Sequence, residues 1–462
     1  MPDKKEQSIE EQKVELFERI PIPRAVMRMA VPTVLSSLVM VIYNLADTYF
    51  VGMLNDPIEN AAVTLAAPVL LAFNAIINLF GVGGSSLMSR YLGKKEYESV
   101  RKSSAISFYC ALAFSVLFSL MAGIFHAQLL GILGTTSDTE AATWQYLRWT
   151  TLCGAVPAIL NVVLANLVRS EGASLHASIG TMSGCLLNIV LDPIFILPMG
   201  FGMGAAGAGL ATFLSNCVAC IYFFVLLWVR RRKTLVCVNP RMFSFDSAIL
   251  KGICAVSVPA AIQNLLNVTS MTVLNNFTSS YGANAVAAMG ITQKINMIPM
   301  YIAMGVSQGI MPLVGYNYAS GNRERMKKAI AFTAKISVTF MLLMTVVYFA
   351  GSEGLIRLFM KNEEVVAYGS RFLQGMCLEL VFLNVDFLAV GVFQACGMGR
   401  KSLVFAILRK VVLEIPALFL LNWLWPLYGL AYAQPCAELV LAIAAVILLG
   451  RIFREPMRGV SN

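Results

Sequence analysis

Residues 43–52 are YNLADTYFVG, and they place one acidic side chain, Asp47, inside an apolar run that extends over residues 25–52. A run of roughly 20 apolar residues spans a bilayer as a helix. An ionised carboxylate at the centre of a bilayer costs roughly 3 kcal/mol on insertion scales, so an acid there usually faces a protein interior or a wet cavity. The segment therefore indicates a membrane-spanning helix. We favour a functional Asp47 over one that only completes a structural hydrogen-bond network.

The whole chain has the composition of a multi-pass membrane protein. Of its 462 residues, 58% are hydrophobic and 13% are charged, whereas soluble domains are about 25% charged. The mean hydropathy is +0.72. We predict twelve spans, at residues 25–52, 58–89, 104–133, 142–169, 175–198, 205–230, 249–280, 285–318, 328–360, 366–396, 401–424 and 428–450.

Charged residues alternate from loop to loop along the chain. Basic residues gather near both termini and after the second, sixth, eighth and tenth predicted spans, whereas the other loops are acidic, balanced or almost uncharged. The positive-inside rule then places both termini in the cytoplasm, which requires an even number of spans. The net charge of +10 thus indicates membrane topology, and we expect a monomer in the plasma or inner membrane with no nucleic-acid partner.

The sequence contains an internal repeat. Val31-Pro32-Thr33 at the first span matches Val258-Pro259-Ala260 at the seventh, and the loop at 92–96 matches the loop at 320–324. The repeat predicts an all-α fold of two pseudo-symmetric six-helix bundles around a central cavity, related by an axis along the membrane normal and suited to alternating access. The predicted parts are a solvated cytoplasmic tail at 1–23, an N-terminal lobe at 24–230, a cytoplasmic linker at 231–248, a C-terminal lobe at 249–453 and a cytoplasmic tail at 454–462.

Asp47 shares a helix face with other candidate cavity residues. Ser36, Met40, Tyr43 and Asp47 follow i, i+4, i+7 and i+11, and this spacing places them on one stripe of a helix. The stripe predicts that Met40 and Tyr43 line the same cavity as the acid.

The fifth span carries a second acid at helical spacing. Asn188 and Asp192 are four residues apart and therefore neighbours on one face. Pro193 has no N–H for the carbonyl of Ile189, so it kinks the helix and frees an oxygen. If Asp47 and Asp192 face each other, their repulsion and desolvation favour the binding of H⁺ or Na⁺ between hard oxygen ligands. The structural alternative is that this segment only shapes a kinked, packed helix.

The second half of the repeat lacks the first acid. With Pro32 aligned to Pro259, the four stripe positions become Gln263, Asn267, Ser270 and Leu274. The predicted ion site therefore belongs to the N-terminal lobe, with Gln263 and Asn267 as candidate cavity residues of the other lobe.

Two further acids lie within spans of the second half. Asp386 in the tenth span either contacts substrate or completes a polar network, and the sequence favours neither. Glu414 in the eleventh span lies one turn from Arg409 and Lys410, so a structural ion pair is at least as good an explanation as a site.

These features together resemble the multidrug and toxic compound extrusion (MATE) family. The matching segments are Pro32 with 47–52, 65–68, Asn188 with 191–193, 207–212 and 394–399, within a resemblance that covers about residues 20 to 451.

The resemblance implies twelve helices in two bundles that form a V, and export of cationic or amphipathic organic compounds driven by inward H⁺ or Na⁺. The N-lobe ion site of the family would fall on Asp47, Asn188, Asp192 and Thr212. The pattern resembles the DinF-like branch more than the NorM-like one, because the NorM-like branch has an acid in the seventh span, where this chain has Asn267.

Other functions fit the sequence less well. A flippase for lipid-linked precursors, in the same superfamily, should have a strongly basic cavity. The charged residues identified within the membrane, Asp47 and Asp192, are acidic instead. An integral-membrane enzyme would need clustered His, Cys or a Ser/Lys pair at membrane depth, and the sequence shows none. We therefore predict a transporter, not an enzyme, with no cofactor and no metal beyond Na⁺ at the coupling site.

Overall fold

The computed structural model describes residues 11–54 and 56–454, and the regular elements in these residues are all helices. The first half contains η1 (Glu15–Arg19), α2 (Ile22–Gly52), α3 (Pro57–Ile77), η2 (Asn78–Val82), α4 (Gly83–Gly93), α5 (Tyr97–Ile124), α6 (His126–Leu133), α7 (Glu140–Leu147), η3 (Arg148–Cys153), α8 (Ala155–Ser170), α9 (Ser174–Ile196) and α10 (Gly204–Val229). The second half contains η4 (Pro240–Met242), α11 (Ser247–Ser279), α12 (Ala283–Ala319), α13 (Arg323–Arg357), α14 (Glu363–Met376), η5 (Cys377–Glu379), α15 (Leu380–Ala395), α16 (Gly399–Ile407), η6 (Leu408–Glu414), α17 (Ile415–Leu424) and α18 (Gly429–Arg454).

The twelve predicted spans correspond to twelve helical segments, several of them interrupted. Within the described residues, ten helices are long and apolar enough to cross a membrane, or eleven when the pair bent by 49° at Gly154 counts as one span. The remaining segment, α16–η6–α17, is broken by a π-helix that carries the buried charges Arg409, Lys410 and Glu414. The all-helical, twelve-segment architecture is confirmed.

The chain divides into two compact units. Unit 1 comprises Met1–Arg19 and Leu35–Ala261, and unit 2 comprises Ile20–Val34 and Ile262–Asn462. Both divisions fall inside long helices, two residues after Pro32 in α2 and two residues after Pro259 in α11. The division at 24–230 and 249–453 remains a prediction from the sequence, and parts of both predicted tails, at 1–10 and 455–462, lie outside the described residues.

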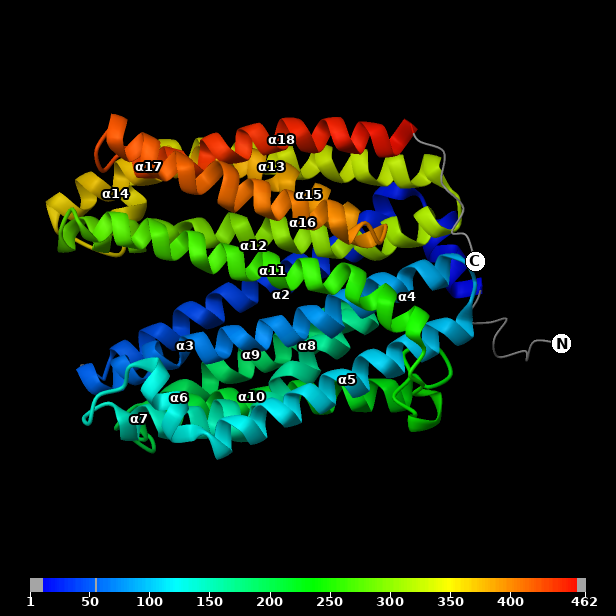
Figure 1. Ribbon diagram of the computed structural model, residues 1–462, viewed down its shortest axis with the longest axis horizontal. Helices are drawn as coiled ribbons and strands as arrows, with labels where there is room; N and C mark the ends of the chain where they lie inside the picture. Colours follow the sequence, from blue (N-terminus) through cyan, green and yellow to red (C-terminus); the bar gives the residue numbers. More distant parts are fainter. Residues whose placement is uncertain (1–10, 55, 455–462) are drawn as a thin grey trace. The chain divides into compact units, whose positions relative to one another are not determined.

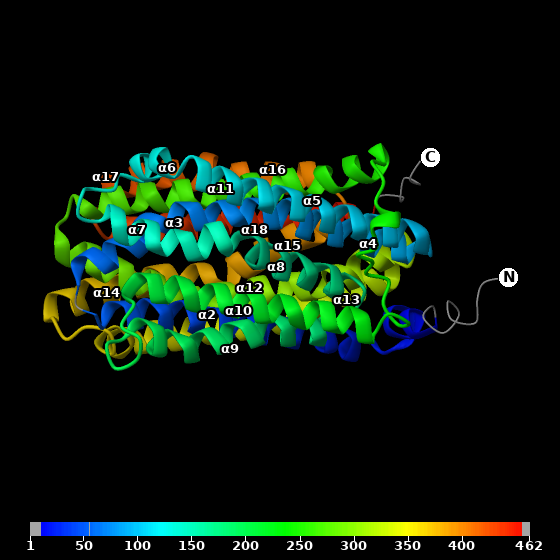
Figure 2. The ribbon, with the colours of Figure 1, turned by 90° about the horizontal axis from the view of Figure 1, so that it is seen from below.

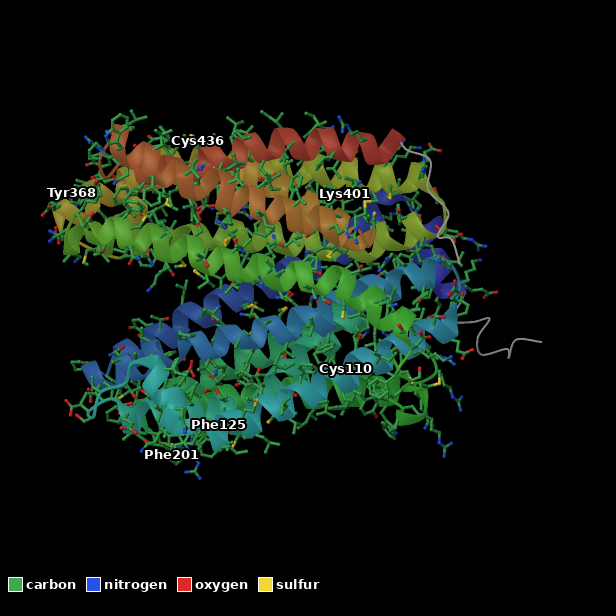
Figure 3. All side chains as sticks on the ribbon, viewed as in Figure 1. Cys110, Phe125, Phe201, Tyr368, Lys401 and Cys436 are labelled. Carbon is green, nitrogen blue, oxygen red and sulfur yellow. The ribbon has the colours of Figure 1, made fainter. Side chains whose placement is uncertain are left out.

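In unit 1, α8, α9 and α10 pack on one another, and α5 packs on α8 (Figure 1). Gly184 on α9 faces Ala219 and the backbone of Ser215 on α10, so the absence of a side chain lets the two helices approach closely. Phe125 and Phe201, in the turns after α5 and α9, lie toward the same end of this unit (Figure 3). Close packing of α9 and α10 fixes the backbone that carries the polar residues of the candidate site.

In unit 2, α12 packs against α13, α14 and α15, and α18 packs against α15 and α17 (Figure 2). The Ser307 hydroxyl on α12 donates to the Phe387 carbonyl on α15 over 2.6 Å. Tyr368 on α14 and Lys401 on α16 lie toward opposite ends of this unit (Figure 3). The bundle therefore runs lengthwise between an end with the α13–α14 turn and an end with the α15–α16 turn.

Part of the predicted solvated tail is folded. Glu15–Arg19 form a π-helix in which Leu16 and Phe17 are buried. Both side chains face Gly172, in the turn between α8 and α9. The prediction of a fully solvated segment is wrong here because the two apolar side chains have a surface to cover.

Candidate functional site

The strongest candidate site lies in unit 1, where α2, α9 and α10 bring polar side chains together. Asp192 on α9 is fully buried at 0% exposure, and Asn188 is buried one turn before it. Asp47 on α2 interacts electrostatically with Asp192. The Tyr43 hydroxyl lies beside the Thr212 hydroxyl of α10 and interacts electrostatically with both acids. The structure therefore places Tyr43 and the four predicted ion-site residues in one cluster.

Asn188 connects α9 to α10. In the amide orientation that satisfies both of its ends, its Nδ2 donates to Asp192 Oδ2 over 3.0 Å and to Oδ1 over 3.3 Å, and its Oδ1 accepts from Thr212 N over 3.1 Å. The opposite orientation points the amide oxygen at two carboxylate oxygens, which repel it. The i, i+4 spacing seen in the sequence produces the contact with Asp192.

Asp47 has an oxygen that no protein donor satisfies. Its Oδ1 is buried, and no hydrogen-bond partner for it exists among the described residues. Among the described residues, no lysine or arginine forms an ion pair with Asp47 or Asp192. Buried carboxylates without a counter-charge are costly, so this arrangement favours the binding of H⁺ or of a small hard cation.

The cluster has ligands for such an ion but no dense metal cage. Pro193 lies inside α9, so the carbonyl of Ile189 has no N–H four residues later. No group of three or more His, Cys, Asp or Glu side chains in the described residues could hold a metal ion. A Na⁺ ion at this position would therefore also need carbonyl, amide or hydroxyl oxygens, whereas a proton needs only one carboxylate.

The other predicted cavity residues lie in both units. Met40 on α2 is half-buried and belongs to unit 1 with the cluster. Gln263 and Asn267 on α11 are half-buried, and Asp386 on α15 is buried, all in unit 2. A role for these four in substrate binding remains a prediction.

Unit 2 contains buried charges that sequence reasoning missed. Glu438 on α18 is 0% exposed and Glu379 in η5 is buried. The predicted ion pair of Glu414 involves Lys410 at 2.6 Å, whereas Arg409 pairs instead with Glu438. The sequence did offer one signal for these buried charges, because Glu379 and Glu438 lie within apolar spans. Their partners are distant in sequence, so the sequence alone could not pair them.

Comparison with known proteins identifies the family. The model of the MatE family matches residues 32–194 and again 259–420. The chain belongs to the MATE family. Because the two matches begin at Pro32 and Pro259, they also confirm the internal repeat.

Curated relatives and solved structures agree with this assignment. The chain is 34% identical over 434 residues, 94% of each chain, to the multidrug export protein MepA of Staphylococcus aureus (strain MRSA252). Its fold matches the outward-facing conformation of a multidrug resistance MATE family transporter of the MOP superfamily, with a TM-score of 0.90, 26% identity, and coverage of 96% of this chain and 98% of the other. A MOP superfamily transporter from Pyrococcus furiosus matches with a TM-score of 0.88, 26% identity, and 96% and 99% coverage.

Family membership confirms three predictions from the sequence. The MATE resemblance, the multi-pass membrane fold and a transporter rather than an enzyme all hold. The DinF-like branch, the monomeric state and the orientation of the termini remain predictions.

Proposed function

We propose that this MATE protein exports cationic or amphipathic organic compounds in exchange for H⁺ or Na⁺, by alternating access. One observation carries the proposal: two acids lie close together with no basic partner among the described residues, Asp192 buried and Asp47 half-buried with a buried Oδ1 that no donor satisfies. A protein stable in a bilayer gains nothing from such a pair unless a cation neutralises it. Reversible occupancy by H⁺ or Na⁺ couples the charge of the cluster to the ion gradient.

The substrate class is supported by the relatives. The relatives from Staphylococcus aureus and Staphylococcus saprophyticus are both described as multidrug export proteins, at 34% and 32% identity. A lipid-linked precursor with a pyrophosphate group is a poorer candidate, because an anionic group would be repelled by the acids of the cluster.

Efflux from proteoliposomes tests the proposal. The purified protein is reconstituted, a fluorescent organic cation is loaded, and a pH gradient or a Na⁺ gradient is imposed separately. We expect one gradient to drive efflux and the other to have no effect. Efflux that responds to neither gradient would contradict ion-coupled export.

Two variants make the experiment specific to the cluster. Asp47→Asn removes the charge of a half-buried carboxylate in the cluster, whereas Asp138→Asn removes a carboxylate from an exposed loop. Gradient-driven efflux should vanish in the first and persist in the second. Equal efflux from both would show that coupling occurs elsewhere.

A further inference from the structure

The segment that joins α10 to α11, residues 230–246, lies outside the polar cluster around Asp47. It begins with four consecutive bases, Arg230, Arg231, Arg232 and Lys233. Within residues 11–54 and 56–454, no Asp or Glu forms an ion pair with any of the four, and the last three are exposed. Figure 1 shows the segment in green, toward the end of unit 1 where α5 begins. It therefore presents uncompensated positive charge at this end of the unit.

The segment is irregular in backbone but is fastened along α5. Leu235 is buried, and the N–H of Cys237 donates to Ser104 Oγ over 3.0 Å. The Tyr109 hydroxyl donates to the carbonyl of Val238 over 2.6 Å. Because α5 holds the segment at these points, the bases just before it stay close to the end of α10.

The bases follow directly on the last turn of a membrane-spanning helix. α10 ends at Val229, and Trp228 beside it is 71% exposed. Tryptophan is enriched where the hydrocarbon core of a bilayer meets the headgroups, so the next residues along the chain lie at headgroup depth. Near the other end of the segment Phe245 is 81% exposed, and its ring centre lies 5.0 Å from that of Phe243. Exposed aromatic side chains thus flank the bases on both sides in the sequence.

Bases in two other parts of the chain have acids beside them. Lys102 pairs with Glu98 at 2.6 Å on α5, and Lys328 pairs with Glu324 on α13. The segment 230–246 contains a single acid, Asp246, whose Oδ1 accepts from a backbone N–H at the start of α11 over 2.8 Å. The positive charge of the segment is therefore left for a partner outside this chain.

We propose that the segment 230–246 is a binding site for anionic phospholipids, with Arg231, Arg232 and Lys233 on the headgroup phosphates. A guanidinium donates two parallel N–H groups to two phosphate oxygens, and each base near a membrane surface strengthens binding to anionic lipid. Trp228 and Phe245 insert between the headgroups and the acyl chains, as aromatic side chains do at this depth. The occupant is a lipid because a lipid satisfies both the charge and the exposed aromatic rings.

Lipid binding by the purified full chain tests the proposal. The protein is titrated in detergent micelles with phosphatidylglycerol or phosphatidylcholine, and native mass spectrometry counts the lipids that stay bound. We expect wild type to bind phosphatidylglycerol more tightly. Arg231→Gln/Arg232→Gln/Lys233→Gln should weaken that binding about tenfold, because each base near the surface contributes to it. The three side chains are exposed, so the variant should fold.

A second triple variant, Lys94→Gln/Lys102→Gln/Lys328→Gln, is the matched control. It lowers the net charge by the same amount, but its three bases each pair with a glutamate. Its affinity for phosphatidylglycerol should stay close to that of wild type. A site at 230–246 thus predicts different results for two proteins of equal net charge.

Hydrogen exchange of the protein in nanodiscs locates the bound lipid. We expect the amides of the segment 230–246 to exchange more slowly in nanodiscs that contain phosphatidylglycerol than in phosphatidylcholine alone. High salt should remove this difference, because it screens exposed charges. The difference should be absent in Arg231→Gln/Arg232→Gln/Lys233→Gln and present in the control.

Four results would overturn the proposal. They are equal binding of the two lipids by wild type, equal losses in the two triple variants, unchanged exchange of the segment, and the same protection by inorganic phosphate added to phosphatidylcholine nanodiscs. The last result would mean that the segment binds the free anion and not a lipid. None of these measurements uses efflux, so the lipid site stands or falls independently of the proposed transport activity.

Discussion

At the Asp47 cluster, the charge of each acid can be removed with little change in its shape. Asp192 is fully buried and accepts hydrogen bonds from Asn188, and Asp47 of α2 interacts electrostatically with it. An aspartate-to-asparagine change keeps the volume and one oxygen, so the surrounding helices need not repack. It therefore separates the effect on coupling from the effect on folding.

We expect Asp47→Asn and Asp192→Asn each to abolish ion-driven efflux while the amount of folded protein in the membrane stays close to wild type. The reason is that the uncharged amide cannot take up and release H⁺, and it is a weaker ligand for Na⁺ than a carboxylate. Drug efflux from cells and fluorescence-detected size exclusion measure the two quantities. Wild-type efflux in Asp47→Asn would rule out the site.

A pair of asparagines compares the two halves of the repeat. Asn188→Ala removes the donor to Asp192. Because a hydrogen bond to a charged group contributes about 1.5–3 kcal/mol, we expect ion-coupled efflux to fall roughly tenfold or more. Asn267 lies on the stripe of α11 that has no acid, and it is half-buried. Asn267→Ala should therefore reduce coupling much less than Asn188→Ala or Asp47→Asn, and comparable losses in efflux assays would mean that both halves take part in the ion site.

At the scale of elements, the turn between α8 and α9 fastens two segments that are distant in sequence. Glu171 in this turn is buried; its Oε1 accepts from Thr234 Oγ1 and its Oε2 from Leu235 N, both over 2.8 Å. Lys13 pairs with the same carboxylate at 3.4 Å and donates to the Glu171 carbonyl over 2.7 Å. The Glu171 side chain thus fastens the start of the segment after α10 to the turn between α8 and α9.

We expect Glu171→Ala to lower the free energy of unfolding by about 2 kcal/mol, because it leaves the buried N–H of Leu235 without an acceptor and removes the carboxylate that pairs with Lys13. The segment after Arg230 should also become more sensitive to trypsin. Glu98→Ala is the control, since Glu98 pairs with Lys102 at an exposed position of α5 and such pairs contribute little. Equal thermal shifts for the two variants would show that Glu171 is not an anchor.

The sequence predicted the helices better than their interruptions. Hydropathy located all twelve segments, and the spacing of Asn188 and Asp192 predicted their contact. The π-helices η2, η3 and η6 have no local signature, because a π-turn depends on how neighbouring helices pack. Glu438 was missed for the same reason: Arg409, 29 residues away, explains its burial, and only the fold brings them together.

At the scale of the molecule, the repeat and the charge pattern jointly predict orientation. The two MatE matches begin at equivalent prolines, so both halves should enter the membrane from the same side. The loop after α10 contains Arg230, Arg231, Arg232 and Lys233, whereas the loop between α6 and α7 contains Asp138 and no base. The positive-inside rule places the first loop in the cytoplasm and the second outside.

Cysteine labelling tests this orientation directly. In a variant whose ten native cysteines are replaced, Lys233→Cys and Ser137→Cys each introduce one thiol at an exposed loop position. A membrane-impermeant maleimide added to intact cells should label Ser137→Cys and should label Lys233→Cys only after permeabilisation, because the basic loop is retained on the cytoplasmic side. The reverse pattern would invert the topology, and with it the direction in which an inward ion gradient drives export. Labelling of both positions in intact cells would mean that the loop charges do not fix one orientation.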